Sequence, residues 1–236
     1  MNAPSEDTRR PLWVDAIILS CSLVLFVSLI GLGNWQVRRL EWKLSLIEAV
    51  EARAYSEAAP LPSEPVTADG HAYLRVRAEG IFDHTRQRRV KAVTELGPGS
   101  WLMTPLKTEN TTVWINRGFV PSGAEDLVLP EGAQTIEGWL RITEPGGTLL
   151  EKNDPEAGRW YSRDVEALSA DAAIEPYAPF FVDADIQAGA EPSWPRAGLT
   201  QLAFRNPHLS YAITWYAMAA LFAAAMGTII WGRVRG

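Results

Sequence analysis

Two long stretches without a charged side chain, one near each end, most constrain how this chain can fold. Residues 16–36 and 209–232 contain no Asp, Glu, Lys or Arg. Each stretch exceeds the roughly 18 residues expected of a membrane-spanning helix. The mean hydropathy of −0.06 hides them, because it averages apolar ends with a polar middle. The sequence therefore predicts a membrane protein with two transmembrane helices, N- and C-terminal, bracketing one polar domain.

The charges that flank these stretches predict an orientation. Arg9 and Arg10 precede the first stretch, and Arg233 and Arg235 follow the second. Positive residues near membrane ends tend to stay cytoplasmic, whereas long loops cross regardless of charge. We therefore expect five segments, which are a cytoplasmic tail (1–12), transmembrane helix 1 (13–34), a periplasmic domain (35–208), transmembrane helix 2 (209–231) and a cytoplasmic tail (232–236). The bacterial inner membrane is the expected location, or the mitochondrial inner membrane with the domain on the intermembrane-space side.

A cleaved signal peptide is the alternative for the first stretch. Its exit, residues 29–35, lacks the Ala-x-Ala pattern that a signal peptidase needs, so an uncleaved anchor is favoured. Aromatic residues flank both stretches, as in interfacial belts. They are Trp13, Trp35, Tyr211, Trp215 and Trp231.

The composition of the middle excludes several classes of protein. Residues 36–208 carry 18 Lys/Arg and 25 Asp/Glu, a net charge of −7. An acidic body lacks the basic surface that nucleic-acid binding needs. Cys21 is the single cysteine and lies inside the first stretch, which excludes a disulfide scaffold and the two-cysteine site typical of copper delivery.

Two patterns predict the structure of the middle domain. Leu40, Leu44 and Ile47 recur at helical spacing, so the first helix should continue beyond the membrane until prolines at 60, 62 and 65. A period of two follows over 72–79 and 136–143. Further strands are expected over 88–94, 101–108, 112–120 and 177–183, with turns at 97–99 and 146–147 and a helix near 162–173. The prediction is a mainly antiparallel β domain of the α+β class, barrel- or sandwich-like.

Catalytic signatures are absent from the sequence, and no enzymatic activity is expected. There is no Gly-x-Ser-x-Gly elbow, no glycine-rich phosphate loop and no His-Glu-x-x-His motif. Asp183 and Asp185 alternate on an extended segment, a pattern more typical of a solvated strand edge than of a metal site. Asp83 with His84 stays open as a cryptic catalytic pair, with a polar turn contact as the alternative.

His208 is the histidine with the most unusual position, because it lies where the second apolar stretch begins. Asn206 is a suitable helix cap and Pro207 a suitable first helical residue. The helix dipole and Arg205 both favour a neutral imidazole at His208, and a neutral imidazole can ligate a metal. Tyr211 and Trp215 follow at helical spacing on the same face. The alternative is an interfacial histidine that only hydrogen-bonds to lipid or backbone.

A matching surface follows the first stretch. Trp35, Arg38 or Arg39, and Trp42 recur at helical spacing, at the membrane depth expected for His208. Imidazole for iron, arginine for propionates and aromatic rings for the macrocycle suit a haem-like ligand. The predicted cofactor site is therefore His208 as metal ligand with Tyr211, Trp215, Trp35, Arg38 and Arg39. The alternative is that Arg38, Arg39 and Lys43 only anchor the helix at the interface.

Four motifs, in order along the chain, resemble the Surfeit-locus-one family of cytochrome c oxidase assembly factors. They are Leu-Gly-Asn-Trp-Gln-Val-Arg-Arg-Leu-Glu-Trp-Lys at 32–43, Gly-Ile-Phe-Asp-His at 80–84, Asn-Arg-Gly-Phe-Val-Pro at 116–121 and Asn-Pro-His-Leu-Ser-Tyr-Ala-Ile-Thr-Trp-Tyr at 206–216. The resemblance implies a role in maturing the large catalytic subunit of haem-copper oxidases, beside other assembly factors. It also implies transient binding of haem a through His208. Residues 121–135 and 145–175 match no motif and are assigned no role. A haem-independent scaffold that stabilises an oxidase assembly intermediate is the main alternative.

Overall fold

The computed structural model describes residues 11–124, 126–147, 151–186, 193–200, 202, 204 and 206–235. It divides into a helical unit, residues 1–47 with 203–236, and a β unit, residues 48–202. Three arginines used in the predictions lie outside the described residues. They are Arg9 and Arg10, used for the orientation, and Arg205, used for the charge of His208.

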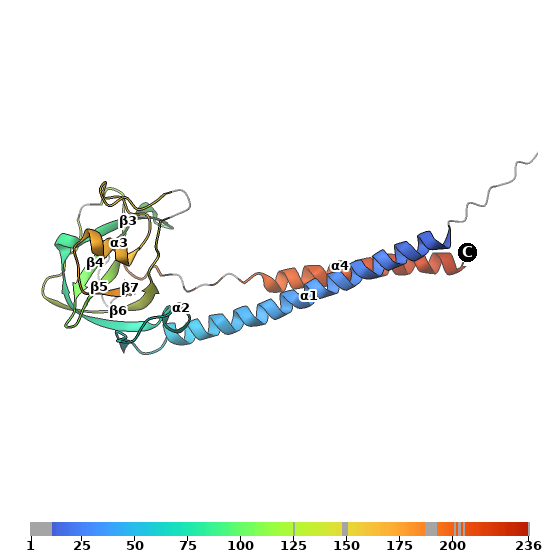
Figure 1. Cartoon of the computed structure of the whole chain (residues 1–236), viewed down its shortest axis with the longest axis horizontal. Coiled ribbons are helices and arrows are strands. Elements are labelled where there is room, and N and C mark those ends of the chain that lie inside the picture. Colours follow the sequence, from blue (N-terminus) through green and yellow to red (C-terminus); the bar gives the residue numbers. More distant parts are fainter. Residues whose placement is uncertain are drawn as a thin grey trace, which may run out of the picture. The chain divides into compact units, whose positions relative to one another are not determined.

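The helical unit is built from two long helices, α1 (Leu12–Ala54) and α4 (His208–Arg235), which lie side by side in opposite directions (Figure 1). Both are long and apolar enough to cross a membrane, over Trp13–Ala54 and His208–Arg233. The predicted two-helix membrane protein is thus confirmed. Helix α1 also continues well past residue 34, as its apolar spacing predicted, and ends at Ala54 before the prolines.

A seam of less exposed residues joins the two helices. On α1 it runs through positions 22, 26, 29, 33, 36 and 40, and on α4 through 208, 212, 215, 219, 222 and 226. Steps of four and three residues keep these positions on one face of each helix. Tyr216 Oη donates to Asn34 Oδ1 at 2.7 Å, and Arg233 pairs with Asp15 at the far end. The described part of the helical unit is therefore a closely packed antiparallel hairpin.

The start of α4 differs from the prediction by one residue. The first helical bond runs from the Tyr211 amide to the Pro207 carbonyl at 3.3 Å, so Pro207 is the cap and His208 the first helical residue. The Asn206 side chain makes no hydrogen bond to any described residue and does not cap the helix.

The β unit is a seven-stranded sheet in the order β1-β2-β6-β7-β5-β4-β3. Its strands are β1 (Ala59–Pro60), β2 (Arg75–Phe82), β3 (Arg88–Thr94), β4 (Gly97–Lys107), β5 (Thr112–Pro121), β6 (Ala133–Ile142) and β7 (Tyr177–Ala184). A further pairing of β2 with β4 joins the two sides, so β2, β6, β7, β5 and β4 form a closed ring. Short helical segments α2 (Ala68–His71), η1 (His84–Arg86) and α3 (Val165–Asp171) lie between strands. The predicted barrel-like, mainly antiparallel domain is confirmed, with β1–β2 and β5–β7 as parallel pairs.

Two apolar clusters form the core of this unit. Alternate residues of the five ring strands, such as Val76, Leu106, Ile115, Leu140 and Val182, fill the inside of the barrel. The opposite faces of β3, β4, β5 and β7 pack against α3 and the segment around Trp160. One turn prediction was wrong, because residues 97–99 lie inside β4 and the hairpin turn falls on the two residues before them. Gly97 has a φ of +97°, and this left-handed backbone at the first residue of β4 explains the glycine.

Candidate functional site

His208 lies on the seam of the helical hairpin and contacts α1 through its ring. Its Nδ1 is 2.8 Å from Oε1 of Gln36, and Gln36 is only 8% exposed although it lies in an apolar stretch. An amide oxygen can only accept, so Nδ1 donates to it, and in the neutral ring the electron pair is then on Nε2. No described residue bonds to Nε2. Such an oriented tautomer is the form in which histidine ligates metals.

The two predicted aromatic residues of α4 have different surroundings. Trp215 is half-buried on the seam, two turns beyond His208, and Ala212 between them is buried. Tyr211 is 53% exposed and lies off the seam. The structure therefore places His208 and Trp215 on the face of α4 that meets α1, and leaves Tyr211 outside it.

The predicted residues of α1 lie outside the seam. Trp35 and Trp42 are about half exposed, and Arg38 and Arg39 are exposed as well. At 100° per residue these four positions project from one side of α1, about 60° (Arg39) to 160° (Arg38) around the helix from Gln36. The Arg39 guanidinium lies 4.0 Å from the centre of the Trp42 ring, a cation–π contact. This group, Trp35, Arg38, Arg39 and Trp42, is called the outer stripe below.

The residues present fit a haem-type group in their donor chemistry. The hairpin offers one imidazole whose second nitrogen is held by Gln36, and the outer stripe offers aromatic faces and two guanidinium groups. His208 would hold the iron, and Arg38 or Arg39 would pair with propionates. Gln36 was missed in the sequence analysis. Its signal was a long polar side chain at the end of a charge-free stretch, seven residues after Leu29 on the same face.

In the β unit, the carboxylates of Asp183 and Asp185 are bound by neighbouring side chains of the protein. Asp183 is only 2% exposed, and its carboxylate accepts hydrogen bonds from several side chains. The donors and distances are Arg141 at 2.6 Å, Asn116 at 2.8 Å, Thr200 at 3.1 Å and Arg163 at 3.2 Å. Asp185 instead pairs with Arg75 at 3.0 Å. The interpretation of a solvated edge was therefore wrong for Asp183, and the described residues hold no cluster of metal-ligating side chains.

The buried network also affects the ionisation of an arginine. Burial disfavours the charge of Arg163 more than any other single influence. Asp183 and Glu144 together outweigh it, and the pKa of Arg163 is raised above its ordinary value. Arg163 thus stays charged at neutral pH, and the pair of Arg141 on β6 with Asp183 on β7 joins these two strands.

The pair Asp83 and His84 does not form a hydrogen-bonded unit among the described residues. Asp83 accepts from Thr85 at 2.6 Å and pairs with Lys107 at 3.2 Å. His84 Nε2 lies 2.9 Å from the Pro130 carbonyl. The two side chains thus serve separate loop contacts, as the alternative of a polar turn contact predicted.

Comparison with known proteins agrees with the four motifs. The family model described as "SURF1 family" matches residues 23–220, which include all of them. The chain is 33% identical to Surfeit locus protein 1 of Homo sapiens over 232 residues, covering 87% of this chain and 75% of the relative. It is 34% identical to that of Mus musculus (87% and 73%) and 30% identical to that of Takifugu rubripes (84% and 90%). With most of both proteins covered at these identities, this chain belongs to the SURF1 family.

Proposed function

We propose that this protein is a cytochrome c oxidase assembly factor that binds or presents haem a while the large catalytic subunit matures. Membership of the family and the two membrane helices support the general role. The observation that carries the haem proposal is the Nδ1 bond of His208 to Gln36, which leaves Nε2 without a bond to any described residue. Haem supplies an iron that accepts an imidazole nitrogen, together with two propionates.

The chain's own residues would hold the group without any catalytic step. Gln36 fixes the tautomer and orientation of His208, and such second contacts of a metal ligand commonly alter affinity by tenfold to a hundredfold. The outer stripe would cover the macrocycle and pair with its carboxylates. We further propose that the protein resides in the inner membrane with the β unit in the periplasm, beside other oxidase assembly factors.

A haem-independent scaffold is the second candidate, and one observation favours it. The outer stripe is exposed rather than gathered around His208. An exposed row of aromatic and arginine side chains is also typical of protein–protein interfaces. In this reading the stripe would contact an oxidase subunit directly.

The experiment that separates the candidates starts from cells that make haem a and lack this protein. Restore the wild type or His208→Ala, then measure assembled oxidase, co-purified oxidase subunit and the optical spectrum of the purified protein. The haem proposal predicts pigment with the wild type, and loss of pigment and of assembled oxidase with His208→Ala. Full rescue by a pigment-free His208→Ala protein that still co-purifies with the subunit would establish the scaffold instead.

A further inference from the structure

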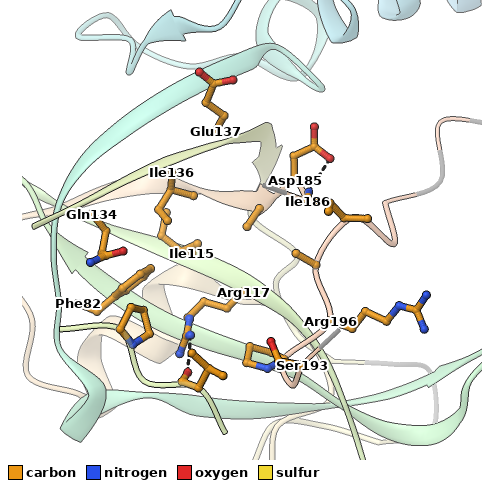
Figure 2. Close-up of a pocket in the computed structure, with 15 residues that line it drawn as sticks. Phe82, Ile115, Arg117, Gln134, Ile136, Glu137, Asp185, Ile186, Ser193 and Arg196 are labelled. Carbon is orange, nitrogen blue, oxygen red and sulfur yellow. Dashed lines mark hydrogen bonds between the residues drawn. The ribbon is translucent and has the colours of Figure 1, made fainter. Parts of the chain in front are cut away.

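The open end of the barrel in the β unit holds a cavity of about 370 Å³. Its walls are mostly apolar and come from strand ends and two loops (Figure 2). The main apolar residues are Phe82, Ile115, Val128, Pro130, Ile136 and Ile186. A cavity of this size with few polar groups, at the mouth of a barrel, is a typical small-molecule site.

Arg117 is the unusual member of this cavity. Val113 and Ile115 on β5 point into the barrel core, and the period of two places Arg117 at the next inward position. Arg117 is only 9% exposed. Strands of a small barrel fill such positions with apolar side chains, so a guanidinium there requires a reason.

The guanidinium is only partly satisfied by the protein. Nη2 donates to the Val128 carbonyl at 2.7 Å, and the Phe82 ring lies 5.1 Å away. Nη1 is buried and bonds to no described residue, and no described carboxylate pairs with the group. Burial lowers the pKa of Arg117 to about 10, so the group remains charged at neutral pH. A buried, unpaired cation is costly unless an anion arrives from outside.

The other charges of the cavity narrow the class of anion. Glu137 and Asp185, at the opposite side, already pair with Arg77 and Arg75, so their charges are balanced within the protein. Arg196 is exposed and points away from the cavity (Figure 2). Arg117 thus offers one guanidinium charge to a ligand, which favours a singly charged group over a phosphate ester, and the guanidinium fork matches a carboxylate.

We propose that the barrel mouth binds a small amphipathic carboxylate, with its apolar body among the cavity walls and its carboxylate paired with Arg117. The pairing supplies the missing acceptor for Nη1 and compensates the buried charge. This site is separate from the haem proposal, which concerns the helical unit.

The test uses the full-length protein in lipid nanodiscs and fluorine NMR of para-trifluoromethyl phenylacetate, with empty nanodiscs as the baseline. Its primary amide, equal in shape and uncharged, serves as the comparison ligand. We expect the acid to bind at least about tenfold more tightly than the amide, because hydrogen bonds to charged groups are the stronger ones. Arg117→Met should weaken the acid by about tenfold or more, whereas the matched variant Arg196→Met should keep parental affinity.

Two results would overturn the proposal. They are no binding of the acid by the wild type, and equal binding of the acid by wild type and a folded Arg117→Met. If Arg117→Met does not fold, Ala197→Phe is the second variant, since it fills the cavity mouth and leaves Arg117 intact. Loss of binding by Ala197→Phe supports the cavity as the site, and unchanged binding refutes it.

Discussion

At the scale of single residues, small and polar side chains decide how the two helices meet. Gly33 lies under the Tyr216 ring, and a Cβ added there would fall 2.5 Å from Cε1 of that ring. Three positions further along α1, Gln36 reaches His208. Close helix approach through a small residue and a polar contact across the seam are both characteristic of membrane helix pairs.

Replacing Gly33 by Leu should separate the helices, because the tyrosine ring and the new side chain cannot share the space. The measurement uses a Cys21→Ala background with Cys placed at positions 22 and 226, and follows disulfide formation between them. In the structure Ser22 Oγ lies 3.6 Å from Met226 Sδ. We expect cross-linking to slow by at least about threefold. Gly31→Leu is the matched control, since nothing lies within 4 Å of its Cβ position. Equal cross-linking in the two variants would contradict the packing described here.

Asp183 should matter for stability rather than for any reaction. Asp183→Asn leaves Arg141 and Arg163 buried with one carboxylate fewer, and breaking such a pair costs about 3–5 kcal/mol. Asp185→Asn removes a pair with Arg75 that is more exposed than those of Asp183. It should lower the free energy of unfolding by about 1 kcal/mol or less. Urea unfolding of the β unit, followed by tryptophan fluorescence, measures both. Equal losses for the two variants would show that burial of Asp183 has no energetic weight.

At the scale of elements, the sequence predicted where strands and helices lie better than what their side chains touch. The range 88–94 matches β3, and 112–120 and 177–183 match β5 and β7 to within one residue. The alternation of apolar and polar residues and the positions of turn residues are local signals, and they were sufficient to locate these strands. The partner of His208, the buried position of Asp183 and the inward Arg117 depend on contacts between distant strands or helices. No local pattern carries that information, which is why these three were missed or misread.

Asp83, which directly follows β2, should make the stability of the β unit depend on pH in the acid range. Hydrogen bonding by Thr85 is the main influence that lowers the pKa of Asp83, Lys107 adds to it, and burial opposes it. A lowered folded-state pKa contributes stability above the unfolded-state pKa and loses it as the pH falls through the folded value. We expect Asp83→Asn to be less stable than the parent at pH 7 and to show a flatter decline below about pH 4. Thr85→Val should change the decline in the same direction but less, and parallel curves for all three proteins would refute the assignment.

At the scale of the whole molecule, the proposed orientation rests on charge at the membrane ends. Both termini should face the cytoplasm and the β unit the periplasm. Alkaline phosphatase, which is active only outside the cytoplasm, should be active when inserted in the exposed turn at residues 156–158 and inactive when fused after residue 236. A green fluorescent protein fusion after residue 236 should fluoresce. The opposite pattern of activities would invert the orientation.

We propose that His208, oriented by Gln36, is the iron ligand of this protein, and titration of the purified full-length protein with haem is the decisive measurement. The affinity of wild type, His208→Ala, Gln36→Leu and the control His84→Ala is read from the optical spectrum. We predict that His208→Ala loses the spectrum of a histidine-ligated haem. Gln36→Leu should bind about tenfold to a hundredfold more weakly, while His84→Ala should match the wild type. A His208→Ala protein that binds haem as tightly as the wild type, with the same spectrum, would show that His208 is not the iron ligand.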